Sequence, residues 1–168
     1  MIDENTLTQY YAAIAQKLDE LIPCEWEKVA LYAEETEYTR MALFYFYTED
    51  GNYHYCENIW EKYGVDEKEY DRLMQELENI NVSLWLVFKE SGEEPWHSFT
   101  FTLDKDGKFN MKFSYVNSED EGVDAMQTKI RWAYDELGIL PPGTYGKKLL
   151  KKYLLSRERE LPEELKDI

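Results

Sequence analysis

Two runs of alternating residues around the tetrapeptide Asp104-Lys105-Asp106-Gly107 constrain the fold more than any other part of the sequence. Phe99, Phe101 and Leu103 alternate with threonines before the tetrapeptide, and a second alternating run from Phe109 to Tyr115 follows it. An alternation with period two on both sides of an Asp-Gly turn predicts a β-hairpin. The chain is therefore expected to contain antiparallel sheet.

The same tetrapeptide could also open a calcium-binding loop. Such a loop needs oxygen ligands at its positions 1, 3 and 5 and a glycine at position 6. Counted from Asp104, position 5 is Lys108 and position 6 is Phe109. A lysine cannot coordinate a cation, and phenylalanine cannot replace the glycine. We therefore interpret the tetrapeptide as a turn and predict no metal site there.

The remaining periodicity predicts an α+β fold. Its mainly antiparallel sheet has about five strands packed with four to five helices, in the order α-β-β-β-α-β-β-α-α. Hairpin-connected strands, without β-α-β alternation, favour this class. We expect a single domain over residues 1–160 and a frayed tail over 161–168. The other predicted elements are helices near 6–22, 66–90, 123–137 and from 144, and strands near 28–33, 41–47 and 53–55.

The charge of the chain excludes some partners and favours others. The formal net charge is −16. Residues 1–138 carry 12 Lys and Arg against 30 Asp and Glu, whereas residues 139–168 carry 7 against 5. An acidic body repels nucleic acid and anionic membranes and attracts basic proteins. The alternative is that the charge only keeps the protein soluble.

No segment of the sequence has the character of a membrane span or a secretion signal. The longest apolar run, 41–47, has seven residues, far below the roughly 20 that a membrane-spanning helix needs. The acidic residues Asp3 and Glu4 stand where a signal peptide is basic. We therefore expect a cytoplasmic protein.

A search for catalytic groups gives little. His54 and His97 each lie in a predicted strand, without a nearby serine or cysteine that could be a nucleophile. Cys24 and Cys56 lack the spacing of a metal site and are expected to be reduced thiols. There is no glycine-rich phosphate loop. We predict no enzyme activity, no catalytic residues, no metal and no cofactor. A lysine-rich stretch in the last helix is interpreted as a solvated face; it comprises Lys147, Lys148, Lys151 and Lys152.

Acidic residues in turns and loops are the candidate partner-binding residues. One group is the loop with Glu119, Asp120 and Glu121, together with Asp124. The other consists of two strand turns, which contain Glu34, Glu35, Glu37, Glu49 and Asp50. The two turns follow consecutive strands, so we expect them at opposite ends of the sheet. The loop is favoured because it has four acids within six residues.

Aromatic residues and two alternatives complete the functional interpretation. Tyrosine and tryptophan are abundant, with 14 and 5 residues, and both are enriched where proteins bind proteins. Trp26 and Trp96 each stand at the beginning of a predicted strand and are expected to anchor the sheet edge or the packing of a helix. The acidic loop from Glu119 to Asp124 could alternatively serve a metal-dependent enzyme. The chain could also be an adaptor that binds a basic protein without inhibiting it.

The order of several short motifs resembles the YezG/EsaG immunity family along nearly the whole chain. Ile22-Pro23-Cys24-Glu25-Trp26-Glu27-Lys28-Val29 resembles the family's opening pattern. Further matches are the segment 55–59, Glu94-Pro95-Trp96, Gly107-Lys108-Phe109, the segment 132–140 and Tyr145-Gly146-Lys147-Lys148. The resemblance implies a cytoplasmic antitoxin of Gram-positive bacteria that neutralises a cognate, secreted nuclease toxin of the type VII (LXG-like) pathway. It implies no catalytic residues, and it identifies neither the toxin-binding residues nor the oligomeric state.

Overall fold

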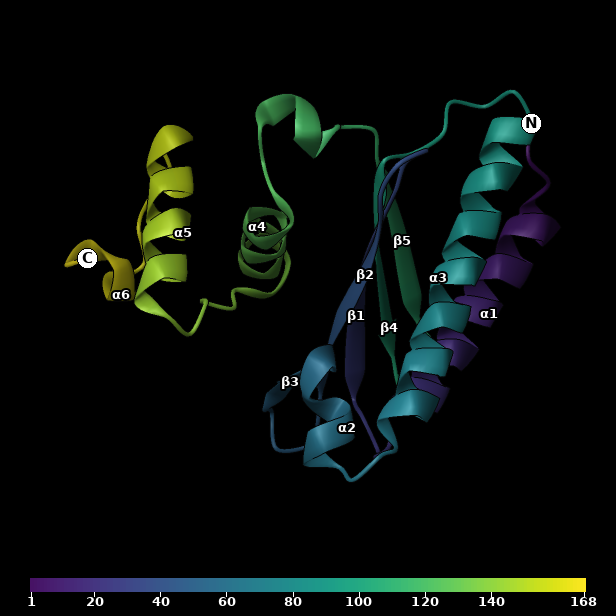
Figure 1. Cartoon of the computed structure of the whole chain (residues 1–168), viewed down its shortest axis with the longest axis horizontal. Coiled ribbons are helices and arrows are strands. Elements are labelled where there is room, and N and C mark those ends of the chain that lie inside the picture. The colour runs from purple at the N-terminus through teal and green to yellow at the C-terminus, as the bar shows by residue number, and fades with distance from the viewer. The chain divides into compact units, whose positions relative to one another are not determined.

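The computed structural model describes residues 1–168, except for the side chain of Glu119. The chain forms two compact units, Met1–Val116 and Asn117–Ile168. The first unit contains a five-stranded antiparallel sheet with the strand order β3-β2-β1-β4-β5 (Figure 1). Its strands are β1 (Lys28–Glu35), β2 (Arg40–Tyr47), β3 (Tyr53–Tyr55), β4 (Ser98–Asp104) and β5 (Phe109–Ser114).

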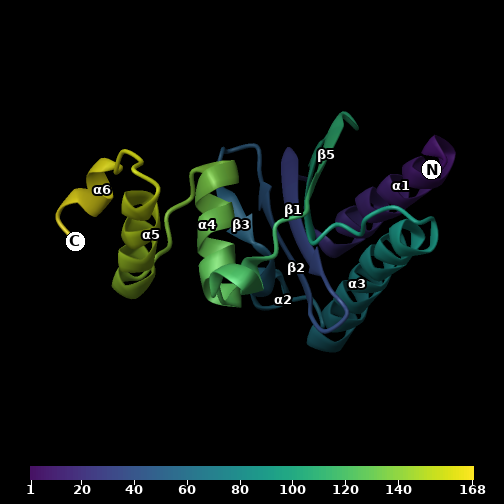
Figure 2. The ribbon, with the colours of Figure 1, turned by 90° about the horizontal axis from the view of Figure 1, so that it is seen from above.

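The two long helices of this unit, α1 (Glu4–Leu21) and α3 (Glu67–Glu90), cover the same face of the sheet (Figure 2). Every second residue of each strand points to that face, and most of these residues are apolar and buried. Leu31, for example, lies opposite Phe44 of β2 and Phe101 of β4. Tyr11 of α1 contacts the rings of Phe101 and Phe109, so the helix is packed directly on the sheet.

The helix boundaries follow the capping signals in the sequence. Asp66 caps the N-terminus of α3, where its Oδ2 accepts a hydrogen bond from the backbone N–H of Glu69 at 3.3 Å. Ser91 ends the helix. Between β3 and α3 the chain makes two short helical turns that the sequence pattern did not predict. They are η1 (Cys56–Asn58) and α2 (Ile59–Lys62).

The predicted hairpin is confirmed, and the carboxylate of Asp104 holds its turn. Asp104 Oδ1 accepts hydrogen bonds from the backbone N–H groups of Asp106 (2.9 Å) and Lys108 (3.0 Å). The backbone N–H of Gly107 donates to Asp104 O at 3.0 Å. Gly107 has a φ of +88°, which side-chain-bearing residues rarely adopt. The aspartate therefore stabilises the turn through the backbone.

We expect Gly107→Val to lower the free energy of unfolding by about 1–2 kcal/mol. The cost is backbone strain alone, because a Cβ at this position would meet no atom within 4 Å. Chemical denaturation of both proteins measures the difference. Gly143→Val is a useful control, because that glycine has no positive φ and equally open surroundings. Equal stability of the parent and Gly107→Val would contradict the turn assignment.

The second unit, Asn117–Ile168, consists of helices that pack around a small apolar core. Its elements are η2 (Ser118–Glu121), α4 (Ala125–Leu137), α5 (Thr144–Ser156) and α6 (Glu163–Lys166). Gly138 ends α4 in the left-handed conformation, which glycine adopts without strain. Ile130 of α4 and Leu150 and Leu154 of α5 form the core together with Leu165 of α6.

Residues 161–168, predicted to be frayed, include the ordered helix α6. Leu165 has no exposed surface, and Leu161 and Ile168 pack against the same core. The ammonium group of Lys151 donates hydrogen bonds to Ile168 O at 2.5 Å and to Lys166 O at 3.3 Å. Leu161, Leu165 and Ile168 are too few to give a periodic signal in the sequence. They are nevertheless enough to attach the segment to the core of the second unit. The predicted single domain over 1–160 stays a prediction.

The α+β class and the order of the predicted elements are confirmed. Among the described residues, no helix combines the length and the apolar character that crossing a bilayer requires.

Candidate partner-binding surface

The turn between β1 and β2 does not present the acidic surface that the sequence suggested. Glu35 is only 3% exposed, which corrects its prediction as a surface residue. Glu37 is exposed, but its carboxylate forms an ion pair with Lys89 of α3 at 2.7 Å, and this hydrogen bond lowers the pKa of Glu37. Tyr38, at the tip of the turn, is 90% exposed.

Glu35 is buried because it lies on the apolar, helix-covered face of β1. Burial away from water raises the pKa of its carboxyl to about 8. The charge of Arg40, whose Nε lies 3.8 Å from Glu35 Oε2, opposes this effect and lowers the pKa, but burial outweighs it. The negative charges of Glu78 on α3 and of Glu34 raise the pKa further. The carboxyl is therefore largely neutral at pH 7 and is unsuited to attracting a basic partner.

The turn between β2 and β3 is acidic and exposed, but only one of its two acids is engaged in holding it. Asp50 accepts hydrogen bonds from Thr48 Oγ1 at 2.6 Å and from the backbone and side chain of Asn52. These bonds lower the pKa of Asp50. Glu49 beside it is exposed and forms no ion pair with the described residues.

The loop between β5 and α4 was the favoured partner-binding site in the sequence, but two of its acids, Glu121 and Asp124, have structural roles. Asp124 is the N-cap of α4, and its Oδ1 accepts from the backbone N–H of Gln127 at 2.8 Å. Glu121 lies 3.5 Å from an Arg157 nitrogen and 4.0 Å from one of Arg131. Asp120 is exposed. The side chain of Glu119 lies outside the described residues.

The nine candidate acids therefore do not form one patch. The turns after β1 and β2 lie at opposite ends of the sheet, as expected from the strand order. The loop belongs to the second unit. A partner-binding role for the exposed acids among them stays a prediction.

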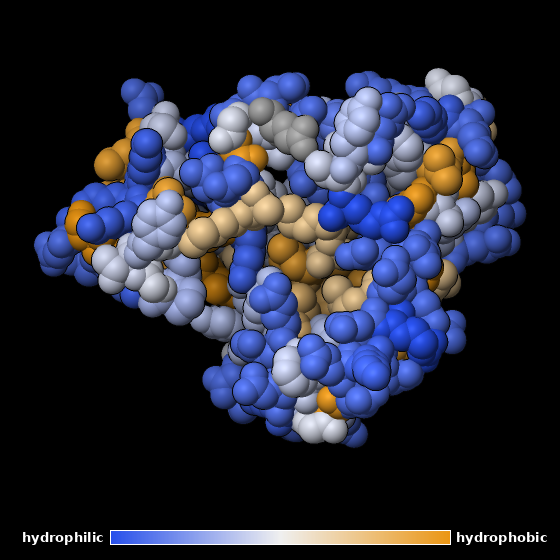
Figure 3. All heavy atoms as spheres, in the orientation of Figure 1, coloured by the Kyte–Doolittle hydropathy of each residue, from blue (hydrophilic) through white to orange (hydrophobic). Residues whose placement is uncertain are grey.

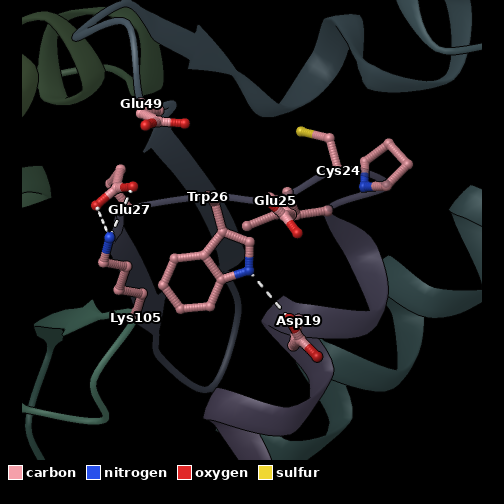
Figure 4. A pocket seen from close by; sticks show the side chains of 9 residues that line it. Asp19, Cys24, Glu25, Trp26, Glu27, Glu49 and Lys105 are labelled. Atoms are coloured by element: carbon pink, nitrogen blue, oxygen red, sulfur yellow. Dashed lines mark hydrogen bonds and ion pairs between the residues drawn. The ribbon is translucent and has the colours of Figure 1, made fainter.

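A hollow at one end of the sheet brings together acids that sequence analysis mostly missed (Figure 4). We call it the Trp26 hollow; it has a volume of about 650 Å³. Four segments meet there: the end of α1, the segment before β1, the β2–β3 turn and the β4–β5 turn. The lining residues are Asp19, Ile22, Pro23, Cys24, Glu25, Trp26, Glu27, Glu49 and Lys105.

Trp26 is the central residue of the hollow. It is half-buried, and its indole Nε1–H donates a hydrogen bond to Asp19 Oδ1 at 3.0 Å. Of the two tryptophans expected to anchor the sheet edge or helix packing, Trp96 is fully buried, whereas Trp26 lies half-buried at the end of α1. Trp26 is flanked by Glu25 and Glu27 in the sequence. This flanking is atypical of a core residue and could have indicated a surface position.

The hollow has an excess of negative charge. Four carboxylates line it, against the single ammonium group of Lys105. That ammonium is paired with Glu27, with distances of 2.8 and 3.0 Å to its two carboxylate oxygens. Glu25 and Glu49 are exposed and have no ion-pair partner in the described part of the chain.

The titratable groups whose side chains the structure describes show no arrangement for metal chemistry. Where side chains are described, no group of three or more His, Cys, Asp or Glu could hold a metal ion. The metal-dependent alternative therefore gains no support from these residues. Cys24 and Cys56 are both free thiols.

Hydrophilic residues dominate the face visible in Figure 3, in keeping with the acidic composition.

An acidic α+β protein with an aromatic, negatively charged hollow fits the class of small partner-binding proteins. A family model described as "Immunity protein YezG-like" matches residues 7–151. The chain therefore belongs to the YezG-like immunity protein family. Membership implies an immunity role, in which the protein binds a cognate toxin.

Three relatives support this assignment. Immunity protein YezG of Bacillus subtilis is 32% identical over 145 residues, which cover 86% of this chain and 96% of that protein. Immunity protein YezG of Bacillus spizizenii is 30% identical over 161 residues, or 95% and 100% of the two chains. The type VII secretion system protein EsaG of Staphylococcus aureus is 26% identical over 170 residues, or 100% and 99%.

Proposed function

We propose that this protein neutralises a cognate nuclease toxin in the cytoplasm by binding it, without catalysing a reaction itself. The family assignment supplies the immunity role. The observation that supports a nuclease as the toxin is the charge of the first unit. Residues 1–116 carry 10 Lys and Arg against 24 Asp and Glu.

The physical argument rests on the substrate of nucleases. A nuclease binds a polyanion, so the surface that holds its substrate is basic. An acidic protein is attracted to such a surface, which accelerates encounter and favours a complex that competes with DNA. A toxin acting on an anionic target inside the cell also requires its inhibitor in the same compartment.

We expect a gene for a toxin with a C-terminal nuclease domain to lie beside this one, and the test uses that toxin. We expect co-expression to rescue cells from that toxin. We also expect the purified protein to block DNA cleavage by the toxin's C-terminal nuclease domain at a molar ratio near one. The DNA product is measured on a gel over time. Cell death despite co-expression, with unchanged DNA cleavage, would refute the proposal.

Two controls separate the alternatives. Melting curves with calcium, magnesium and manganese test the metal-dependent enzyme, because bound metal raises the melting temperature. A complex that forms while cleavage continues would instead identify a non-inhibitory adaptor.

A further inference from the structure

We infer that the Trp26 hollow receives basic side chains, lysine or arginine, from the surface of the toxin. This assignment rests on the proposed function and adds the place and chemistry of the contact. The hollow is formed entirely within Met1–Val116.

The negative charge in the hollow is only partly compensated. Lys105 offsets Glu27 at 2.8 Å, and Asp19 accepts the indole N–H of Trp26 at 3.0 Å. Glu25 and Glu49 approach the hollow from two different segments, and neither forms an ion pair with any described residue. The charge of Lys105 reaches Glu49 without forming an ion pair with it, so the four carboxylates of the hollow keep an excess of negative charge. This excess favours the arrival of a further cation, because opposite charges stabilise each other most when a partner excludes water.

Trp26 gives the hollow a second property that matches a basic side chain. The hydrogen bond to Asp19 fixes the orientation of the indole ring, so little side-chain entropy is lost when a partner packs on it. Tryptophan is the aromatic residue that attracts cations most strongly across its ring face. It can also pack against the methylene groups of lysine or arginine. Acids around an ordered tryptophan therefore match both parts of such a side chain.

Other occupants fit the hollow less well. A nucleic acid would be repelled by its carboxylates. A second copy of this chain has the same net charge of −16, so close approach of two copies at this acidic surface is unfavourable. A basic protein surface is the occupant for which the charges are complementary.

Binding to the toxin's nuclease domain tests the assignment directly. We expect the double variant Glu25→Gln/Glu49→Gln to associate roughly tenfold more slowly than the parent at low salt, with a weaker salt dependence. Trp26→Ala should instead raise the dissociation rate. Stopped-flow mixing at two salt concentrations measures the association rates. Surface plasmon resonance measures the dissociation rates.

A matched control removes the same charge elsewhere on the first unit. Glu90→Gln/Glu94→Gln changes two exposed carboxylates near the start of β4, at the opposite end of the sheet. We expect this variant to associate within twofold of the parent. Equal association rates for the hollow variant and the control variant would overturn the assignment. Melting curves of all variants confirm that each is folded.

A second measurement tests the hollow without the toxin. The indole N–H resonance of Trp26 is identified by its loss in Trp26→Phe. We expect penta-arginine to shift this resonance more than those of the other four tryptophans, and pentaglutamate to leave it unchanged. A Trp26 resonance that penta-arginine does not move would overturn the assignment. Failure of the parent to inhibit the nuclease would instead refute the proposed function.

Discussion

We expect Trp96→Ala to lower the free energy of unfolding by about 3–5 kcal/mol, the largest loss from any single truncation considered for this protein. Trp96 has no exposed surface. Its ring lies edge-to-face with Phe99 at a centroid distance of 5.1 Å and tilted against Phe113 at 5.8 Å. Removing the indole leaves a cavity beside Phe99 of β4 and Phe113 of β5.

Chemical denaturation followed by circular dichroism measures this loss. Trp96→Phe is an informative second variant, because the indole Nε1–H of Trp96 has no hydrogen-bond partner among the described residues. Replacing the indole by a phenyl ring removes this unsatisfied donor while keeping most of the apolar contact. We therefore expect Trp96→Phe to cost clearly less than Trp96→Ala.

Trp26→Ala is the matched comparison for Trp96→Ala. Trp26 is half-buried and lies at the surface, so its truncation should cost less than half as much stability. A Trp96→Ala protein that unfolds at the same denaturant concentration as the parent would contradict the packing described here.

Periodicity predicted β4 and β5 well because their apolar residues alternate and lie on the face of the sheet that α1 and α3 cover. The alternation around Asp104 and Gly107 predicted the hairpin, and the helix predicted near 66–90 matches α3, whose N-cap is Asp66. The strand that pairs with β1 on the side away from β2 could not be derived from the sequence. Sequence pattern does not tell which strand pairs with β1 across a long helical connection, and the structure places β4 there.

The position of Glu35 was predictable, although the sequence prediction missed it. Val29, Leu31 and Ala33 alternate on the buried face of β1. Extending that alternation by one step places Glu35 on the same face. The predicted strand ended at Ala33 because glutamate is uncommon in buried positions. The structure continues β1 to Glu35.

The Trp26 hollow could be predicted only in part. Trp26 between two glutamates indicates an acidic, aromatic segment, but nothing local brings Asp19, Glu49 and Lys105 to it. These three residues come from a helix end and two strand turns that are distant in sequence. Their meeting depends on which turns lie at the same end of the sheet, and this follows from the strand order.

The buried carboxyl of Glu35 makes the stability of the protein depend on pH. Its pKa is about 8 in the folded protein and 4.5 as the ordinary value. Between these values the folded state binds a proton that the unfolded state lacks, so the free energy of unfolding falls as the pH rises. The contribution is fully present below pH 4.5 and is lost through pH 8, with a slope of at most about 1.4 kcal/mol per pH unit.

We expect Glu35→Gln to remove this dependence, because a glutamine at the same place has no proton to lose. At pH 8 the variant should be more stable than the parent by about 2 kcal/mol or more, whereas at pH 5 the two should be nearly equal. Urea denaturation at pH 5, 6, 7 and 8 measures the difference. Glu90→Gln, which changes an exposed carboxylate of α3, is the control and should differ from the parent equally at every pH.

Glu78→Gln should show a smaller change in the same direction, because partial burial also raises the pKa of Glu78 while the charge of Arg40 lowers it. If the stability difference between Glu35→Gln and the parent were the same at pH 5 and pH 8, the Glu35 carboxyl would be ionised in the folded protein, and β1 would have to admit water at its end.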